Sequence, residues 1–209
     1  MSEISNLLNL QSKLKDNRID ILVINRSDEF LNEYISPYAE RLQFVTNFSG
    51  SAGKAIILQN EAFLYVDGRY TFQAKEQINE NEIQSKHLKS FWEDLKTYIS
   101  KKSCTIAVDP KLHSIREIQK IQEYILNTSS NIIFLESNII DSIWKNKPSI
   151  KYSNIFDHPI QYSGVDRVEK LINFKKIFKE KNIDHYLVTG LDNIAWLLNI
   201  RADDILYTP

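Results

Sequence analysis

An internal repeat constrains the fold of this chain more than any other feature of its sequence. Residues 15–24 end a predicted helix and begin a predicted strand, and residues 179–188 repeat that pattern. The dipeptide Ile19-Asp20 recurs as Ile183-Asp184, 164 residues further along. Two helix–strand units could resemble one another by chance. The shared dipeptide and the matching apolar positions instead favour duplication, since sequence similarity at a fixed offset is the signature of a repeated structural unit.

A second pair of segments extends the repeat. Residues 42–48 match residues 194–200 at an offset of 152 residues, so the first copy has the longer loop between its two segments. The first copy continues to about Leu135, whereas only 27 residues remain from Ile183 onward. An unpaired strand with uncovered apolar faces does not form a stable sheet alone. We therefore expect the chain to be the front part of a longer protein.

The order of apolar patterns predicts an α/β domain over residues 1–138. Helical spacing of apolar residues covers segments near residues 4–14, 91–99 and 115–125. Strand-sized apolar runs lie at residues 19–24, 42–45, 55–58, 63–66, 105–108 and 132–135. The runs at 55–58 and 63–66 are separated by four residues, which is typical of a β-hairpin. The sequence therefore predicts a mixed sheet flanked by helices.

A second domain of the same kind is predicted to begin near residue 163. Residues 139–162 contain Pro148 and Pro159 and are predicted to be a linker. The run Ser163 to Asp166 has the form of a capping box, and a long amphipathic helix is predicted after it. A strand at residues 185–188 follows. We expect residues 163–209 to be the incomplete start of this second domain.

Composition excludes several classes of protein and site. The chain has 209 residues and a formal net charge of −1, which gives no electrostatic reason to expect nucleic acid or an anionic membrane as a partner. Its single cysteine, Cys104, excludes a disulfide framework and a Cys-rich zinc site. No apolar run approaches the roughly 20 residues of a membrane span, and the acidic N-terminus does not resemble a signal peptide. We therefore expect a cytoplasmic location.

The usual catalytic motifs are absent from the sequence. The four histidines are widely scattered and no spacing suggests a metal site, so we predict no metal ligands and no catalytic residues in this chain. Asp203-Asp204 is expected on a solvated loop, and Cys104 is expected to be buried and inert. The run Gly50 to Lys54 resembles part of a P-loop, but Phe48 and Ala55 occupy positions where that motif needs Gly and Ser or Thr.

Three motifs carry a resemblance to a known family. They are Phe48-Ser49-Gly50-Ser51-Ala52-Gly53, Val66-Asp67-Gly68-Arg69-Tyr70-Thr71-Phe72-Gln73-Ala74 and Ala195-Trp196-Leu197-Leu198-Asn199-Ile200-Arg201. Together they resemble the cytosolic-type aminopeptidase P (Xaa-Pro aminopeptidase) family, related to creatinase and prolidase, across essentially the whole chain. The departures are Asn47, Ser49 and Ala202, where relatives often have Gly, Thr and Gly.

The resemblance implies a three-part architecture and a chemistry located elsewhere. It implies two creatinase-type N-terminal domains followed by a "pita-bread" metallopeptidase domain, in which two divalent ions, usually manganese, activate the water that attacks an X-Pro bond. The implied ligands are two Asp, one His and two Glu of that third domain, beyond Pro209. The implied substrate is a peptide with proline at its second position, and the implied assembly is a homodimer.

The resemblance also implies which residues of this chain lie near a substrate. The loop that approaches the partner's active site in family dimers corresponds to Phe48, Ser49, Gly50, Ser51 and Gly53. A tight turn with close backbone packing is the alternative for this loop. Arg69 and Arg201 are candidates to face the cleft, although Asp67 to Tyr70 also fits a turn in which Asp67 caps a helix and Arg69 pairs locally.

The sequence leaves two other functions open besides that of a metallopeptidase portion. A creatinase-like module without enzymatic activity would bind peptides or proteins, as in non-enzymatic relatives. A nucleotide-binding α/β protein would need a glycine-rich turn between a strand and a helix, and the sequence offers none apart from the loop at Gly50.

Overall fold

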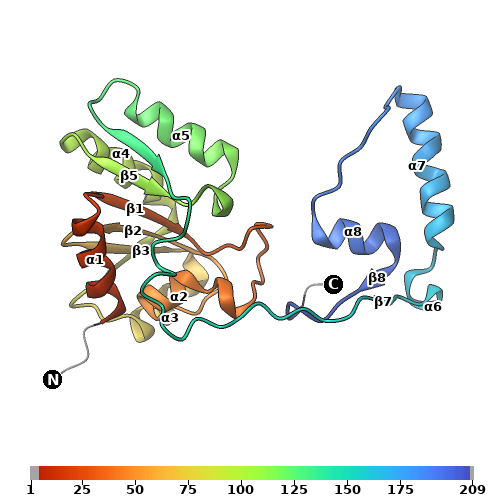
Figure 1. Ribbon diagram of the computed structural model, residues 1–209, viewed down its shortest axis with the longest axis horizontal. Coiled ribbons are helices and arrows are strands. Elements are labelled where there is room, and N and C mark those ends of the chain that lie inside the picture. Colours follow the sequence, from red (N-terminus) through yellow and green to blue (C-terminus); the bar gives the residue numbers. More distant parts are fainter. Residues whose placement is uncertain (1–4, 208–209) are drawn as a thin grey trace. The chain divides into compact units, whose positions relative to one another are not determined.

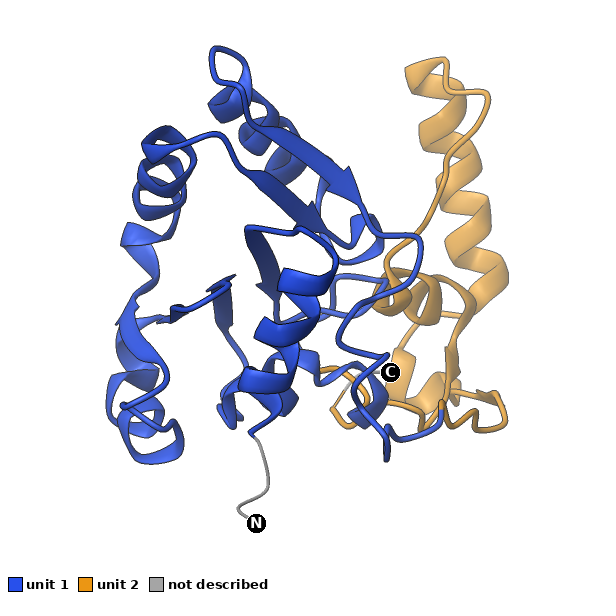
Figure 2. Cartoon of the chain, turned by 60° about the vertical axis from the view of Figure 1, so that its left-hand side comes forward, with its two compact units in different colours: residues 1–33, 37–149 blue, residues 34–36, 150–209 orange. Residues whose placement is uncertain are grey.

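The chain forms two units in the computed structural model, which describes residues 5–207 (Figure 2). The first unit comprises residues 1–33 and 37–149, and the second comprises residues 34–36 and 150–209. The predicted boundaries at residues 138 and 163 stay predictions.

The first unit is an α/β domain, as the sequence predicted (Figure 1). Its α-helices are α1 (Asn6–Asp16), α2 (Arg41–Thr46), α3 (Thr71–Gln77), α4 (Phe91–Lys101) and α5 (Ile115–Ile125). Its strands are β1 (Ile21–Asn25), β2 (Gly53–Leu58), β3 (Ala62–Val66), β4 (Gln84–His87), β5 (Thr105–Val108) and β6 (Asn131–Phe134). Short 3-10 helices cover Pro37–Ala39, Gly68–Tyr70, Leu88–Ser90 and Pro110–Leu112.

The six strands form one mixed sheet in the order β4-β3-β2-β1-β5-β6. Strand β1 pairs antiparallel with β2, placing Ile21 opposite Leu58, and parallel with β5, placing Ile21 opposite Ile106. Strands β2 and β3 form the predicted hairpin. The sheet is mixed because a short turn allows only an antiparallel connection, whereas β5 and β6 are parallel and are joined through α5.

Helices cover both faces of this sheet. On one face α1, α2 and α3 pack on alternate strand residues such as Leu22 and Leu64, and on the other face α4 and α5 pack on Val23 and Tyr65. All five residues of β1 are buried because the strand is covered from both sides. This explains why its sequence is a continuous apolar run, without the alternation expected of a half-exposed strand.

The strand predicted at residues 42–45 is wrong, because these residues lie in helix α2. Its buried residues are Arg41, Leu42, Val45 and Thr46, which is the spacing of one helix face. The helix ends at Asn47, whose backbone is left-handed at φ 64°. A run of four apolar residues is too short for periodicity to distinguish a helix from a strand.

The second unit contains few elements. They are β7 (Phe156–Asp157), α6 (Ile160–Ser163), α7 (Arg167–Lys181), α8 (Leu191–Leu198) and β8 (Ile200–Arg201), and β7 pairs antiparallel with β8. The long helix predicted after Asp166 is confirmed as α7, but its cap is different. Asp166 itself is the N-cap and accepts a hydrogen bond from the Val168 amide, whereas Ser163 ends α6.

The strand predicted at residues 185–188 is also wrong, since these residues have no regular secondary structure. In the first copy of the repeat, β1 is hydrogen-bonded to β2 on one side and to β5 on the other. Among the described residues of the second unit, the two strands β7 and β8 pair only with each other. A strand without a neighbour gains no ladder of hydrogen bonds to offset its ordering, so residues 185–188 stay irregular.

The helix ends of the two copies nevertheless agree residue by residue. Arg18 and Asn182, 164 positions apart, both have left-handed backbones, at φ 55° and 53°. The amide of the next residue in each copy donates a hydrogen bond to the carbonyl five residues before it. Ile19 donates to the Leu14 carbonyl and Ile183 donates to the Phe178 carbonyl, each at 2.9 Å. The repeated sequence therefore encodes the same helix stop twice, which requires only local contacts.

Candidate functional site

The loop between α2 and β2 is the segment that the sequence predicted to face a substrate. Phe48 anchors it, because its side chain is completely buried in the core cluster that also contains Leu42. Full burial of one such side chain contributes about 1.5–3 kcal/mol to stability. The Tyr70 and Phe48 rings pack edge to face, with centroids 5.6 Å apart. The loop is thereby fixed to the domain at its first residue.

Two glycines allow the backbone of this loop to pass close to that aromatic pair. A Cβ atom at Gly50 would lie 2.2 Å from Phe48 Cζ and 2.9 Å from Tyr70 Cδ1. A Cβ atom at Gly53 would lie 3.0 Å from Phe48 Cε1 and 3.1 Å from Leu42 Cδ2. The motif therefore requires small residues at these positions for packing, whatever else the loop does.

Ser49 is exposed and is tied to helix α3. Its hydroxyl oxygen accepts hydrogen bonds from Gln73 Nε2 at 3.1 Å and Gln77 Nε2 at 2.8 Å. The Ser49 amide donates to Gln77 Oε1 at 2.9 Å. The two glutamines are four residues apart, so both lie on the face of α3 that meets the loop.

Ser51 lies within a short chain of hydrogen bonds. Its hydroxyl donates to Glu33 Oε1 at 3.1 Å and lies 2.7 Å from the Tyr70 hydroxyl. A serine hydroxyl has one proton, so Tyr70 donates to Ser51 when Ser51 donates to Glu33. Hydrogen bonds are therefore donated from Tyr70 to Ser51 and from Ser51 to Glu33, whose carboxylate is the final acceptor.

Arg26 connects this loop to the preceding loop of the first unit. Its Nη1 donates to the Glu33 carbonyl at 2.6 Å and to the Ser51 carbonyl at 3.2 Å, and its Nη2 pairs with Glu40 Oε1 at 2.6 Å. Burial raises the pKa of Glu40, and the adjacent Arg26 charge opposes that rise. Arg26 thus fixes the backbone on which Ser51 lies.

Arg69 is exposed and pairs locally, in agreement with the turn predicted for Asp67 to Tyr70. Its Nη2 lies 2.6 Å from Asp67 Oδ2, and its amide donates to Asp67 Oδ1 at 2.9 Å. The side-chain hydrogen bond from Arg69 lowers the pKa of Asp67. Its guanidinium lies 5.3 Å from the centroid of the Tyr70 ring. Arg69 therefore lies next to Tyr70, which in turn contacts Phe48 and Ser51 of the loop.

Arg201 lies in the second unit. Its Nη1 donates to the Ile200 carbonyl at 2.7 Å and to the Ala195 carbonyl at 3.3 Å, next to the end of α8. Asp204 accepts a hydrogen bond from the Ser153 amide, and the Asp203 amide donates to Ser153 Oγ at 2.7 Å. The acidic pair thus holds a loop of the second unit in place.

Residues 5–207 do not fit a two-metal centre. Within that range no three His, Cys, Asp or Glu side chains gather in a way that would hold a metal ion. Cys104 is buried, its thiol lies 3.3 Å from Ser130 Oγ, and burial raises its pKa, so it has the character of a structural cysteine. No helix within residues 5–207 has the length and apolar character needed to cross a bilayer.

The arrangement around the loop supplies hydrogen bonds and an aromatic surface. Among the described residues, the hydrogen-bond partners of the Ser49 and Ser51 hydroxyls are carboxamides, a phenol and a carboxylate, with no imidazole to act as a base. Sequence reasoning missed Arg26, Glu33 and the two glutamines, because their contacts join residues far apart in the chain. The i, i+4 spacing of Gln73 and Gln77 on a predicted helix was the available signal.

Comparisons with known proteins agree with the sequence motifs. Two family models, both described as the creatinase/prolidase N-terminal domain, match residues 7–138 and residues 146–209. Among curated proteins, a probable Xaa-Pro aminopeptidase P of Talaromyces marneffei is 33% identical over 207 residues, and one of Paracoccidioides lutzii is 31% identical over 204 residues. These alignments cover 97% and 96% of this chain but only 32% and 33% of the relatives. The chain thus spans about a third of the length of these relatives.

Solved structures share the fold. The crystal structure of an X-prolyl aminopeptidase from Caenorhabditis elegans, described as a cytosolic enzyme with a di-nuclear active site, matches 99% of this chain and 36% of its own with a TM-score of 0.88 and 24% identity. An Xaa-Pro aminopeptidase structure from Streptococcus thermophilus matches 66% of this chain and 94% of its own with a TM-score of 0.51 and 18% identity. The fold, the motifs and the family models that together match most of its length show that this chain belongs to the creatinase/prolidase N-terminal domain family.

Proposed function

We propose that this chain is the non-catalytic N-terminal portion of an Xaa-Pro aminopeptidase. The observation that carries the proposal is the similarity to proteins of that name over 97% of this chain and only 32% of their length. In the whole protein, a two-metal centre, with manganese as the expected ion, would cleave the bond that precedes proline at the second position of a peptide. That centre would lie outside residues 1–209. The protein would act in the cytoplasm as a homodimer.

Within such an assembly, the Phe48–Gly53 loop would form a wall on the substrate side. The support is that its exposed residue, Ser49, presents polar groups on a loop fixed by a buried Phe48 and braced by Arg26. A wall of this kind restricts which peptides enter without taking part in bond cleavage. Arg69, which is exposed next to Tyr70, would face the same cleft. Arg201 of the second unit is proposed as a second cleft residue.

The division of labour is tested with a peptide such as Ala-Pro-Pro and mass-spectrometric detection of released alanine. The purified 209-residue chain is expected to release none in the presence of manganese. A chimera, in which this chain replaces the matching region of the Talaromyces marneffei relative, is expected to release alanine. Turnover by the isolated chain would contradict its non-catalytic role. A folded but inactive chimera would favour the alternative function, a creatinase-like module that binds peptides or proteins.

The role of the loop is tested within the active chimera. Tyr70→Phe removes the donor to Ser51 and should raise KM about fivefold, the effect of losing roughly one neutral hydrogen bond, with a smaller change in kcat. Ser12→Ala on the exposed side of α1 is the matched control. Equal KM and kcat values for the two variants would contradict a role of the loop in substrate selection.

A further inference from the structure

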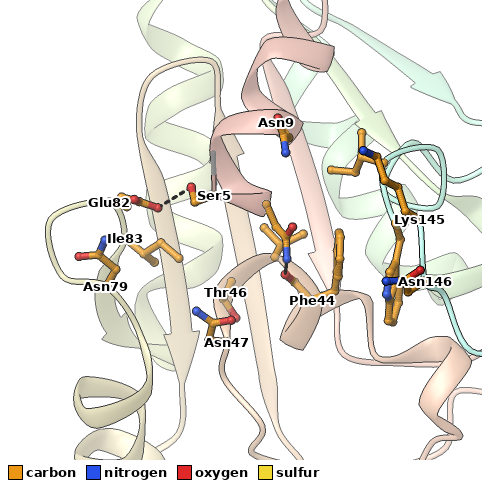
Figure 3. Close-up of a pocket in the computed structure, with 14 residues that line it drawn as sticks. Ser5, Asn9, Phe44, Thr46, Asn47, Asn79, Glu82, Ile83, Lys145 and Asn146 are labelled. Atoms are coloured by element: carbon orange, nitrogen blue, oxygen red, sulfur yellow. Dashed lines mark hydrogen bonds between the residues drawn. The ribbon is translucent and has the colours of Figure 1, made fainter. Parts of the chain in front are cut away.

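A groove of about 650 Å³ lies on the first unit, and its lining contains none of the residues that the proposed function uses. It is lined by the start of α1, the end of α2, the connection from α3 to β4 and residues 143–146 (Figure 3). Carboxamide side chains, including those of Asn9 and Asn47, share the lining with apolar and aromatic side chains such as Phe44 and Trp144. Figure 3 shows Glu82 and Lys145 well apart, on opposite sides of the groove. The groove therefore has an acidic end and a basic end.

The internal repeat identifies the counterpart of this groove in the second unit. The offset of 164 residues pairs α1 with α7, and it aligns Asn6 with Lys170. The offset of 152 residues pairs α2 with α8, and it aligns Phe44 with Trp196. Asn47 and Asn199 are also equivalent, and both end their helices with left-handed backbones. The same polar contact connects each helix pair, from the Asn6 side chain to the Phe44 carbonyl and from the Lys170 side chain to the Trp196 carbonyl.

In the second copy, an ammonium group occupies this position. Lys170 is only 5% exposed, and its Nζ donates to the Trp196 carbonyl at 2.6 Å and to Asn199 Oδ1 at 2.5 Å. The same Nζ lies 4.3 Å from the centroid of the Trp196 ring. A carbonyl, a carboxamide oxygen and an aromatic face thus bind one primary ammonium group there.

In the first copy, the acceptors are retained but the ammonium group is missing. Asn6 donates to the Phe44 carbonyl at 2.9 Å, and its side chain is shorter than that of lysine and uncharged. A carbonyl oxygen accepts two hydrogen bonds, so the Phe44 carbonyl has capacity for a second donor. Asn47 lines the groove together with Phe44, in the position of Asn199. Glu82 adds a carboxylate, whose Oε2 accepts from Ser5 Oγ at 2.8 Å.

We propose that the groove binds a primary alkylammonium group beside Phe44 and Asn47, in the position that Lys170 Nζ takes in the second copy. The acceptors would be the Phe44 carbonyl and the Asn47 carboxamide, and the Glu82 carboxylate would add negative charge on that side of the groove. The alkyl chain would lie along the groove toward Trp144, which stacks on Phe44 with ring centroids 4.6 Å apart. Lys170 in the second copy indicates that the ligand carries a primary ammonium group. In the first copy, Glu82 adds a negative charge that attracts a free ligand, whereas the second copy holds a lysine of its own chain.

The test is a titration of the 209-residue chain with n-butylammonium chloride, followed by amide chemical shifts in NMR. Saturable shifts are expected at Phe44, Asn47 and Glu82, and n-butanol, which has the same chain without the charge, should bind at least about tenfold more weakly. Asn6→Lys should place a lysine ammonium in the site, abolish the saturable shifts and raise the melting temperature. Ser12→Lys adds the same charge to an exposed position of α1 and should leave binding unchanged.

A second variant keeps the test decisive if Asn6→Lys does not fold. Glu82→Gln should weaken n-butylammonium binding about tenfold or more, and Glu80→Gln, the same change at a nearby exposed position outside the groove, should not. Equal binding of butanol and butylammonium would overturn the proposal. So would unchanged butylammonium binding in a folded Asn6→Lys protein or in the Glu82→Gln protein.

Discussion

The Tyr70 ring stands at 81° to the Phe48 ring, and together they fill the space in which a side chain at Gly50 would lie. A Cβ atom there would be 2.2 Å from Phe48 Cζ, much closer than a van der Waals contact. The aromatic pair and the glycine therefore depend on one another. The same contact explains why the loop combines a large buried residue with small neighbours.

We predict that Gly50→Ala lowers the free energy of unfolding by about 1–3 kcal/mol, the usual cost of overpacking a core. Gly68→Ala is the matched control, because its nearest neighbour would be His87 Nε2 at 3.9 Å. Urea denaturation monitored by circular dichroism measures both variants. Equal stability of the two would show that Phe48 moves aside without cost.

Lys170 is predicted to stabilise the second unit. Lys170→Met keeps a long side chain but leaves the Trp196 carbonyl and Asn199 Oδ1 without their buried donor, at a cost of about 1–3 kcal/mol. Hydrogen exchange of the α8 amides should become faster, while exchange in the first unit stays the same. Lys175→Met, on an exposed position of α7, is the control and should not change exchange in α8.

His113 is predicted to make stability depend on pH. Its Nδ1 lies 2.8 Å from the Asp109 carbonyl, and burial lowers its pKa, with the nearby Glu117 and Asp109 raising it and Lys54 lowering it further. The unfolded chain therefore gains a proton at higher pH than the folded chain does. The contribution of His113 to the free energy of unfolding is therefore full above about pH 6.5, the pKa of histidine in the unfolded chain. It is lost as the pH falls below that value.

The measurement is the urea midpoint of the native protein and of His113→Gln between pH 7.5 and pH 5.5. The native protein should lose stability over this range, and the variant should lose less. Glu117 does not account for the difference, since Lys54 holds its pKa below its ordinary value despite the opposing effect of burial, so it titrates at lower pH. Parallel pH profiles for the two proteins would contradict the assignment to His113.

Asp67 is predicted to stabilise the turn between β3 and α3 as a capping residue. Asp67→Ala removes the acceptor for the Arg69 amide and should cost about 1 kcal/mol. Asp67→Asn retains a side-chain oxygen and should cost less, even though it removes the ion pair with exposed Arg69. Thermal unfolding distinguishes the two. A larger loss for Asn than for Ala would assign the stability to the ion pair.

The sequence by itself determined the features that depend on neighbouring residues. The continuous apolar run of β1, the capping box that Ser114 and Glu117 form at the start of α5, and the paired helix stops at Arg18 and Asn182 were all encoded locally. Local capping and burial patterns appear directly in the residue order, because the groups that satisfy one another are a few positions apart.

Tertiary structure alone decided the features that depend on distant partners. Residues 42–45 form a helix because one face packs on the sheet, and residues 185–188 form no strand because they lack the two neighbours that β1 has. The contacts of Arg26 with Ser51 and Glu40, and the equivalent contacts of Asn6 and Lys170 with a backbone carbonyl, also required coordinates. Pairing, burial and coordination are set by residues brought together across the chain, which spacing along the sequence does not record.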